Sequence, residues 1–263
     1  IMERLIKIGK IKTKKASEIK SSRIGIGFEK LDRDIFNPEN AYDKLADIGV
    51  KWVRIQSGWA RTEKEKGVYD FKWIDSVVDN LLDRGLIPWI NLCYGNGLYD
   101  EAASKVFGAV GCPPIKSEEA KNAWANYVKA LAEHMKGRVT YYEVWNEPDG
   151  EWCWKHGPSG KEYGEFVVNT SIALKSGDSD AKVVGGALCI GKTLDFAYDA
   201  FMQGMGEHID AFSFHEYVID ETIVFRHVKA LRGLCDAFNP KIEIIQGESG
   251  SQSRSDGHGA MRK

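Results

Sequence analysis

Short apolar runs alternate with longer amphipathic stretches along most of the chain, a pattern typical of parallel α/β folds. Seven of these runs have the length and the β-branched or aromatic content of buried strands. They begin at residues 24, 52, 87, 139, 182, 211 and 242. Strands and helices that alternate in this way predict βαβ units wound with one hand, and therefore an α/β fold of the (β/α)8 TIM-barrel type.

Helix boundaries can be read from capping residues in the intervening stretches. Asn37 followed by proline is expected to start a helix that ends at Gly49, and Gly85 is expected to end the helix that begins near residue 73. Ser117 is a plausible N-cap for a helix through His134. A further helix is expected over residues 160–176.

The two ends of the chain do not fit the barrel pattern. Residues 1–23 are rich in lysine and are expected to form a solvated lead-in or an extra strand outside the barrel, with residues 24–263 forming one barrel catalytic domain. The polar tail 251–263 contains no candidate for an eighth strand, so the chain is expected to be a fragment that lacks its C-terminal part. An open doubly wound sheet is the rival fold, but no GxGxxG follows the first strand.

Composition and net charge indicate which kinds of molecule the chain is expected to bind. The chain has 263 residues, 43% of them hydrophobic, and a formal net charge of −2. This balance gives no electrostatic reason to expect nucleic acid or an anionic membrane as partner, and it suits a neutral substrate. Five cysteines without CxxC spacing indicate neither a disulfide framework nor a zinc site. No signal peptide or membrane span is visible, and the sequence indicates neither a localisation nor an oligomeric state.

Two glutamates stand where candidate strands end. Glu147 closes the run that starts at Val139, and Pro148 cannot continue a central strand because it lacks an N–H. Glu248 closes the run that starts at Ile242. Strand ends converge at the C-terminal rim of a TIM barrel, so the two carboxylates are expected to lie together there. A pair of carboxylates on separate strands predicts cleavage of a glycosidic bond.

Both strand ends resemble a known group of enzymes. Trp145-Asn146-Glu147-Pro148, with Glu248 at a later strand end, resembles the retaining glycoside hydrolases of clan A. The blocks from Gly25 to Glu29 and from Arg54 to Glu63 are similar more narrowly to family 39 and its relatives. The resemblance extends over roughly residues 24 to 250, and it implies a TIM barrel without a cofactor or metal that acts on a carbohydrate, with a leaning toward β linkages.

The resemblance also implies roles for individual residues. The family glutamate that matches Glu248 is the nucleophile, and the one that matches Glu147 is the general acid/base. Arg54 matches the arginine that keeps the nucleophile ionised. Asn146 matches the residue that binds the sugar 2-hydroxyl, while His215 and Tyr217 match the His-x-Tyr of strand six, whose tyrosine also contacts the nucleophile. The aromatic residue that strand eight places under the sugar has no match here.

Structural roles remain open beside these functional ones. Either glutamate could cap a helix or join an ion pair, and Arg54 could form a buried salt bridge to Asp32 or Glu29. His215 could be a core histidine and Tyr217 could simply pack. A metal hydrolase is disfavoured because no His-x-His or paired ligand set lies on strand one.

Aromatic residues gather in the predicted βα loops. Each could pack within its loop, but as a group on one rim they predict a cleft lining for a sugar. They are Trp59, Tyr94, Tyr99, Trp152 and Trp154. The alternative to an enzyme is a catalytically inactive barrel that serves as a carbohydrate-binding protein, although such a protein has no need for two opposed carboxylates.

Overall fold

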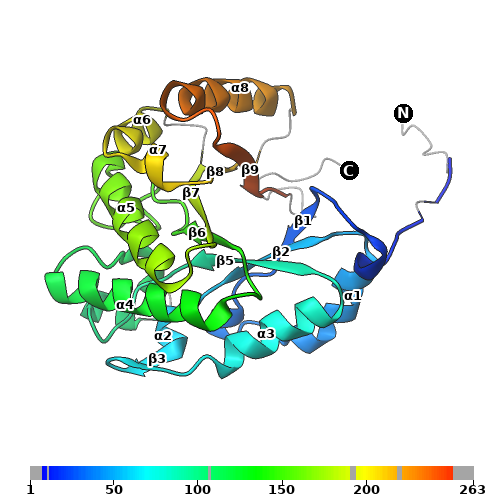
Figure 1. Cartoon of the computed structure of the whole chain (residues 1–263), viewed down its shortest axis with the longest axis horizontal. Coiled ribbons are helices and arrows are strands. Elements are labelled where there is room, and N and C mark those ends of the chain that lie inside the picture. The colour runs from blue at the N-terminus through cyan, green and yellow to red at the C-terminus, as the bar shows by residue number, and fades with distance from the viewer. Residues whose placement is uncertain (1–7, 11, 106–107, 190–193, 218–220, 251–263) are drawn as a thin grey trace, which may run out of the picture.

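The computed structural model describes residues 8–10, 12–105, 108–189, 194–217 and 221–250. Within them, seven parallel strands form one sheet in the order β1-β2-β5-β6-β7-β8-β9, which curves into a nearly closed barrel (Figure 1). The strands are β1 (Gly25–Gly27), β2 (Trp52–Gln56), β5 (Ile87–Leu92), β6 (Tyr141–Val144), β7 (Lys182–Cys189), β8 (Ala211–His215) and β9 (Glu243–Glu248). The predicted TIM-barrel class is confirmed. The tail 251–263, where no eighth strand was expected, lies outside the described residues.

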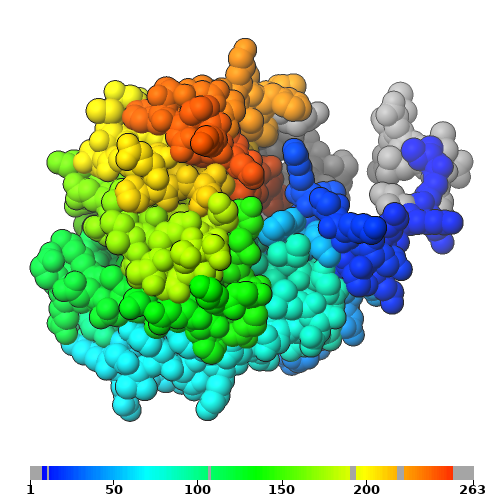
Figure 2. All heavy atoms as spheres, viewed as in Figure 1, coloured from blue at the N-terminus to red at the C-terminus, as the bar shows by residue number. Residues whose placement is uncertain are grey.

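Helices surround the outside of this sheet, and successive strand and helix units follow one another round the molecule from cyan through green and yellow to orange (Figures 1 and 2). The helices are α1 (Tyr42–Asp47), α2 (Trp59–Thr62), α3 (Lys72–Asp83), α4 (Glu118–Met135), α5 (Gly160–Gly177), α6 (Leu194–Met202), α7 (Met205–His208) and α8 (Glu221–Phe238). Short 3-10 helices span Ala16–Glu18, Leu31–Arg33, Pro38–Asn40, Glu101–Ser104 and Ala109–Gly111. A small hairpin of β3 (Glu63–Glu65) and β4 (Val68–Tyr69) lies outside the barrel sheet. No helix of the described part is both long enough and apolar enough for a membrane span.

The expected caps form. The Asn37 side chain accepts a hydrogen bond from the Glu39 amide at 3.0 Å, and the Ser117 hydroxyl accepts one from the Ala120 amide at 3.1 Å. Gly85 ends α3 with a φ of +74°, and a Cβ there would lie 2.7 Å from the Ser17 Cα. Each cap provides a partner or a conformation that the helix end needs.

Alternation along the strands separates two environments. One set of strand residues packs under the helices in the main core, including Val53, Ile90 and Phe212. The other set points into the barrel, where Trp89, Val184 and Ala211 form a separate small cluster. Nearer the strand ends the interior side chains are polar, and they include Arg54, Asn91 and Glu143.

The lead-in before β1 is more than a solvated segment. Ala16 is fully buried in the main core, and the Lys51 ammonium donates to the Ala16 carbonyl at 2.9 Å. The described residues of the lead-in contain no strand, so the expectation of an extra strand is wrong for residues 8–10 and 12–23.

Candidate active site

The β6 end presents Glu147 at the rim of the barrel. β6 stops at Val144, and the next residues turn sharply, with a φ of +65° at Trp145 and +44° at Glu147. Backbone bonds hold this turn: the Trp145 amide donates to the Leu92 carbonyl at 3.0 Å and the Glu147 amide to the Ala187 carbonyl at 2.9 Å. A non-glycine residue at positive φ costs roughly 1–3 kcal/mol, and such costs persist where the surrounding structure fixes a functional group.

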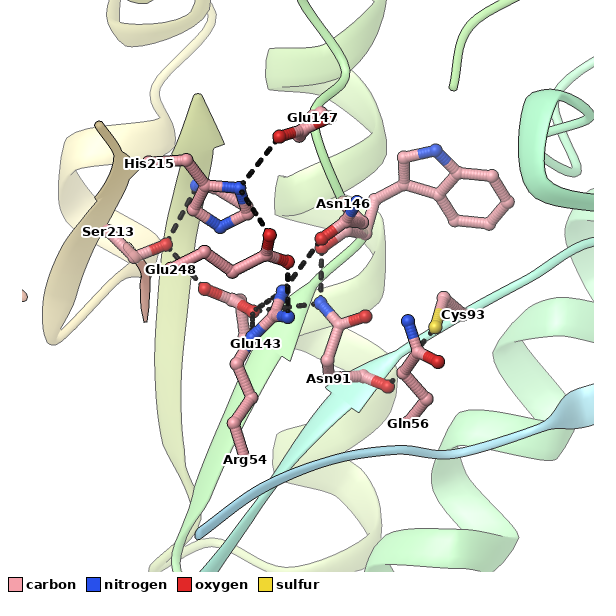
Figure 3. A network of polar contacts seen from close by, with 12 residues as sticks. Arg54, Gln56, Asn91, Cys93, Glu143, Asn146, Glu147, Ser213, His215 and Glu248 are labelled. Atoms are coloured by element: carbon pink, nitrogen blue, oxygen red, sulfur yellow. Dashed lines mark hydrogen bonds and ion pairs between the residues drawn. The ribbon is translucent and has the colours of Figure 1, made fainter. Parts of the chain in front are cut away.

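The β9 end presents Glu248 opposite. Its carboxylate accepts from Arg54 Nη1 at 2.7 Å and from the Tyr217 hydroxyl at 2.8 Å. His215 Nδ1 lies 3.7 Å from Glu248 Oε2 and 3.1 Å from Glu147 Oε1, so the imidazole stands between the two carboxylates (Figure 3).

The two carboxylates approach closely. One ligand atom each of Glu147, His215 and Glu248 lies within 4.8 Å of the others. The same three groups could hold a cation, but Arg54, Tyr217 and Trp152 already direct hydrogen-bond donors at the carboxylates. Carboxyl groups about 5–5.5 Å apart suit a double displacement, whereas about 6.5–9.5 Å would leave room for a water between them.

Arg54 contacts residues at the ends of β6 and β9 and also a carboxylate inside the barrel. Its side chain is 1% exposed and forms ion pairs with Glu29, Glu143 and Glu248. Its Nη2 also donates to Asn146 Oδ1 at 2.8 Å. Three carboxylates around one guanidinium raise the pKa of Arg54 well above its usual range, although burial opposes this. Arg54 is therefore a permanent cation beside Glu248.

The pKa values of the two rim carboxylates move in opposite directions. For Glu147, burial alone would raise the pKa, but hydrogen bonds from His215, Cys189 and Trp152 lower it to about 2. For Glu248, burial raises the pKa, and the opposing effects of His215 and Arg54 do not cancel it. The unliganded site thus favours an ionised Glu147.

A cavity lies beside the site, along the first and last strands of the sheet. Its volume is about 1200 Å³, and it is lined by residues of β1, β2 and β9, including Arg54 and Glu248, and by Tyr217. Glu147, His215 and Trp152 do not line it, so the cavity reaches the site from the Glu248 side.

A family model described as glycosyl hydrolases family 39 matches residues 38–229. The chain belongs to this family. Among curated proteins, it is 28% identical to a β-xylosidase of Caldicellulosiruptor saccharolyticus, over 66% of the chain and 38% of that protein. It is 30% identical to a β-xylosidase of Geobacillus stearothermophilus, over 48% of the chain and 26% of that protein. The matched part is therefore well under half the length of either relative.

Solved structures agree on the fold of this family 39 chain. A family 39 β-xylosidase from Caulobacter crescentus superposes with a TM-score of 0.69 at 21% identity, covering 87% of this chain and 53% of that one. A xylanase from Thermotoga maritima reaches a TM-score of 0.60 at 16% identity. At such identities the likeness concerns the fold alone.

The structure gathers the six expected polar residues at one place, but it divides the aromatic ones. Trp59 and Trp154 are fully buried. Trp59 stacks on Tyr99 and Tyr127, and Trp154 packs edge-on against Trp145 and Tyr163. The prediction that these two tryptophans line the cleft is wrong, because both rings are fully buried among other aromatic side chains.

Two more of the five predicted aromatics, Tyr94 and Trp152, differ from each other. Tyr94 is 5% exposed, and its hydroxyl accepts a hydrogen bond from Gln56 at 3.0 Å, so it supports the rim from below. Trp152 is 52% exposed, and its indole N–H donates to the Glu147 carboxylate. Trp152 is thus the predicted aromatic that lies open beside the carboxylates.

Glu29 forms the ion pair with the buried Arg54 that the sequence left open as a structural role. Sequence reasoning overlooked Asn91 and Ser213, which both bond to Glu143 beside Arg54. Strand alternation was the available signal, because Asn91 pairs with Glu143 in register and both point into the barrel.

Proposed function

We propose that this chain holds the catalytic site of a retaining glycosidase that cleaves β linkages in a neutral oligo- or polysaccharide. The observation that supports this most directly is the approach of Glu147 and Glu248 to within 4.8 Å of each other at their ligand atoms, on two strand ends of a family 39 barrel. That proximity suits attack by one carboxylate and proton transfer by the other.

In this proposal Glu248 is the nucleophile and Glu147 is the general acid/base. Arg54 and Tyr217 each donate to Glu248, and these contacts favour the ionised carboxylate that must attack the anomeric carbon, against the burial that raises its pKa. Attack forms a glycosyl ester on Glu248 and breaks the glycosidic bond, while Glu147 gives its proton to the leaving oxygen. Glu147 then takes a proton from the water that hydrolyses the ester.

Asn146 and His215 complete the proposed machinery. Arg54 fixes the Asn146 oxygen, and the Asn146 amide nitrogen donates one N–H to the Cys153 Sγ at 3.7 Å, which leaves its second N–H to bind the sugar 2-hydroxyl. His215 is 2% exposed and lies within 3.7 Å of both carboxylates, where it positions them relative to each other.

The acid role requires a proton on Glu147, which the unliganded site disfavours. Trp152 donates one of the hydrogen bonds that keep the pKa of Glu147 low. We propose that the leaving-group oxygen displaces the Trp152 N–H from Glu147 when substrate binds. The pKa of Glu147 then rises, because fewer donors stabilise its charge. Esterification of Glu248 afterwards removes a nearby negative charge and lets Glu147 act as a base.

The names of the relatives support a xyloside as the substrate. Two curated relatives are named as β-xylosidases, and the same name belongs to a structural neighbour. Aryl β-xylosides are therefore the first substrates to test.

A covalent trap tests both the activity and the nucleophile. The chain is incubated with an activated fluoroxyloside, digested, and analysed by mass spectrometry. We expect one added glycosyl mass, located on the peptide that contains Glu248. A label on the Glu147 peptide would reverse the roles. Absence of any label, with measurable binding of xylo-oligosaccharide, would favour the carbohydrate-binding alternative.

A further inference from the structure

Glu143 is a buried carboxylate that the proposed chemistry does not use. It lies within β6 and its side chain is fully buried. It belongs to the interior-facing set of strand residues, directly beneath the turn that presents Glu147. A charge in such a place is costly unless it is paired, so its partners indicate what it does.

Glu143 binds the edge of the Arg54 guanidinium that carries Nε and Nη2. Glu143 Oε2 accepts from Arg54 Nε at 2.7 Å and lies 2.6 Å from Nη2. The opposite nitrogen, Nη1, faces Glu248 at 2.7 Å and also contacts Glu29. Because the guanidinium is planar and rigid, fixing its Nε and Nη2 edge also fixes the direction of Nη1.

Glu143 is itself held from two other strands. Asn91 Nδ2 on β5 donates to Oε2 at 2.8 Å. The Ser213 hydroxyl on β8 accepts from the Ala187 amide at 2.7 Å, which leaves its own proton for Glu143 Oε1. Figure 3 shows this network in the barrel interior. The carboxylate is thus fixed by donors on β2, β5 and β8.

We propose that Glu143 is a positioning residue that orients Arg54 toward Glu248, with Ser213 as its own anchor. This rests on the proposed role of Glu248 as nucleophile. A purely structural counter-charge would need only to lie near Arg54. Glu143 instead receives two guanidinium nitrogens on one oxygen and a directed hydroxyl on the other, and the same guanidinium also holds Asn146.

The groups that face Glu248 determine the expected effect of removing Glu143. They are Arg54, Glu29, His215, Tyr217 and, across the gap, Glu147. Replacing Glu143 by glutamine keeps an acceptor for Arg54 but removes one negative charge, so Arg54 is shared by two carboxylates. Replacing it by alanine also removes the anchor, so Nη1 is no longer held toward Glu248.

The test compares E143Q, E143A and S213A with a surface control, E133Q, whose wild-type side chain is 54% exposed. Two readouts are needed: the pH profile of kcat/KM on an aryl β-xyloside, and NMR titration of an isotope-labelled Glu248 carboxyl group. We expect Glu248 to titrate about half to one pH unit lower in E143Q. We expect kcat/KM of E143A to fall about 100-fold or more, with S213A between E143A and wild type.

Each result decides the proposal. Full activity per folded molecule in E143A and S213A, with only a lower melting temperature, would show that Glu143 merely neutralises Arg54, even if Glu248 titrates lower in E143Q. If E143A does not fold, E143Q and S213A still give the comparison. Failure of the wild-type chain to hydrolyse any glycoside would refute the proposed function, while the NMR titration would still test whether Glu143 orients Arg54.

Discussion

At the residue scale, the two carboxylates of the site differ in the groups that surround them. Glu248 contacts a permanent cation and a phenol, while Glu147 contacts an imidazole and an indole. Identical side chains can therefore take different roles, since the local donors and charges set the protonation of each.

Substitution of each glutamate should give different losses. Glu248→Ala removes the proposed nucleophile, so we expect no turnover of any glycoside. Glu147→Gln removes the proton donor, so kcat/KM should fall about 100- to 10,000-fold for alkyl β-xylosides but little for dinitrophenyl β-xyloside, whose leaving group needs no proton. Steady-state kinetics on both substrates makes the comparison. Equal losses for both leaving groups in Glu147→Gln would contradict the acid assignment.

The indole of Trp152 should tune the pH profile. Its N–H favours ionised Glu147, whose pKa is lowered to about 2. Trp152→Phe keeps an aromatic ring but removes the donor, so the pKa of Glu147 should rise. The basic limb of kcat/KM requires protonated Glu147 and should therefore move to higher pH, by about half a unit to one unit for an exposed bond. Tyr198→Phe, at an exposed position on α6, is the control. A basic limb that stays in place would show that Trp152 does not affect Glu147.

At the element scale, the strands could be predicted from the sequence. Their apolar runs are short, and helices with recognisable capping residues separate them. The seven strands appear where the runs lie, and the Glu147 turn follows β6 as Pro148 required. The hairpin of β3 and β4 was not foreseen, because Glu63 looks like a surface residue. Its carboxylate is in fact buried and accepts from Trp59, Tyr99 and the Gly67 amide.

The wrong predictions for Trp59 and Trp154 also arose because contacts with residues distant in sequence decide where a side chain lies. A sequence shows that Trp59 and Trp154 follow strand ends, but not whether a ring turns toward the cleft or beneath it. Partners distant in sequence decide this, since Trp59 stacks on Tyr127 of α4. The polar residues were easier to place, because strand alternation and a buried charge each need a partner at the same level of the barrel.

Close packing of α5 on α6 gives a stability prediction at this scale. A Cβ at Gly164 would lie 2.6 Å from the Ala200 carbonyl and 2.8 Å from its Cα, so the helices would have to separate. Gly164→Ala should destabilise the chain by about 1–2 kcal/mol, even though alanine favours helices by up to about 1 kcal/mol. Gly233 on α8 has no atom within 4 Å of its Cβ position, so Gly233→Ala should stabilise by about 0.5–1 kcal/mol. Urea denaturation measures both, and equal signs would contradict the packing argument.

At the scale of the whole molecule, the part of the barrel that the structure describes has a closed side and an open side. β2, β5, β6, β7 and β8 each pair with two neighbours, whereas β1 and β9 each pair with one among the described residues. The cavity of about 1200 Å³ lies along this open side and is lined by both end strands. The site therefore combines rigid parts on β2 and β6 with Glu248 on a strand that has one partner.

This asymmetry predicts a gradient of protection across the sheet. Backbone amides exchange through local opening, which is easier where a strand lacks a second neighbour and a buried face. All four residues of β6 are buried or half-buried, but β1 is largely exposed and the burial of β9 is incomplete. Hydrogen-exchange mass spectrometry should therefore show slow exchange in β5 to β7 and faster exchange in β1 and β9. A covalent xylosyl ester on Glu248 should slow exchange in β9 more than in β1, because the sugar would contact the end of β9 directly. Exchange in β9 as slow as in β6 without ligand would contradict this gradient.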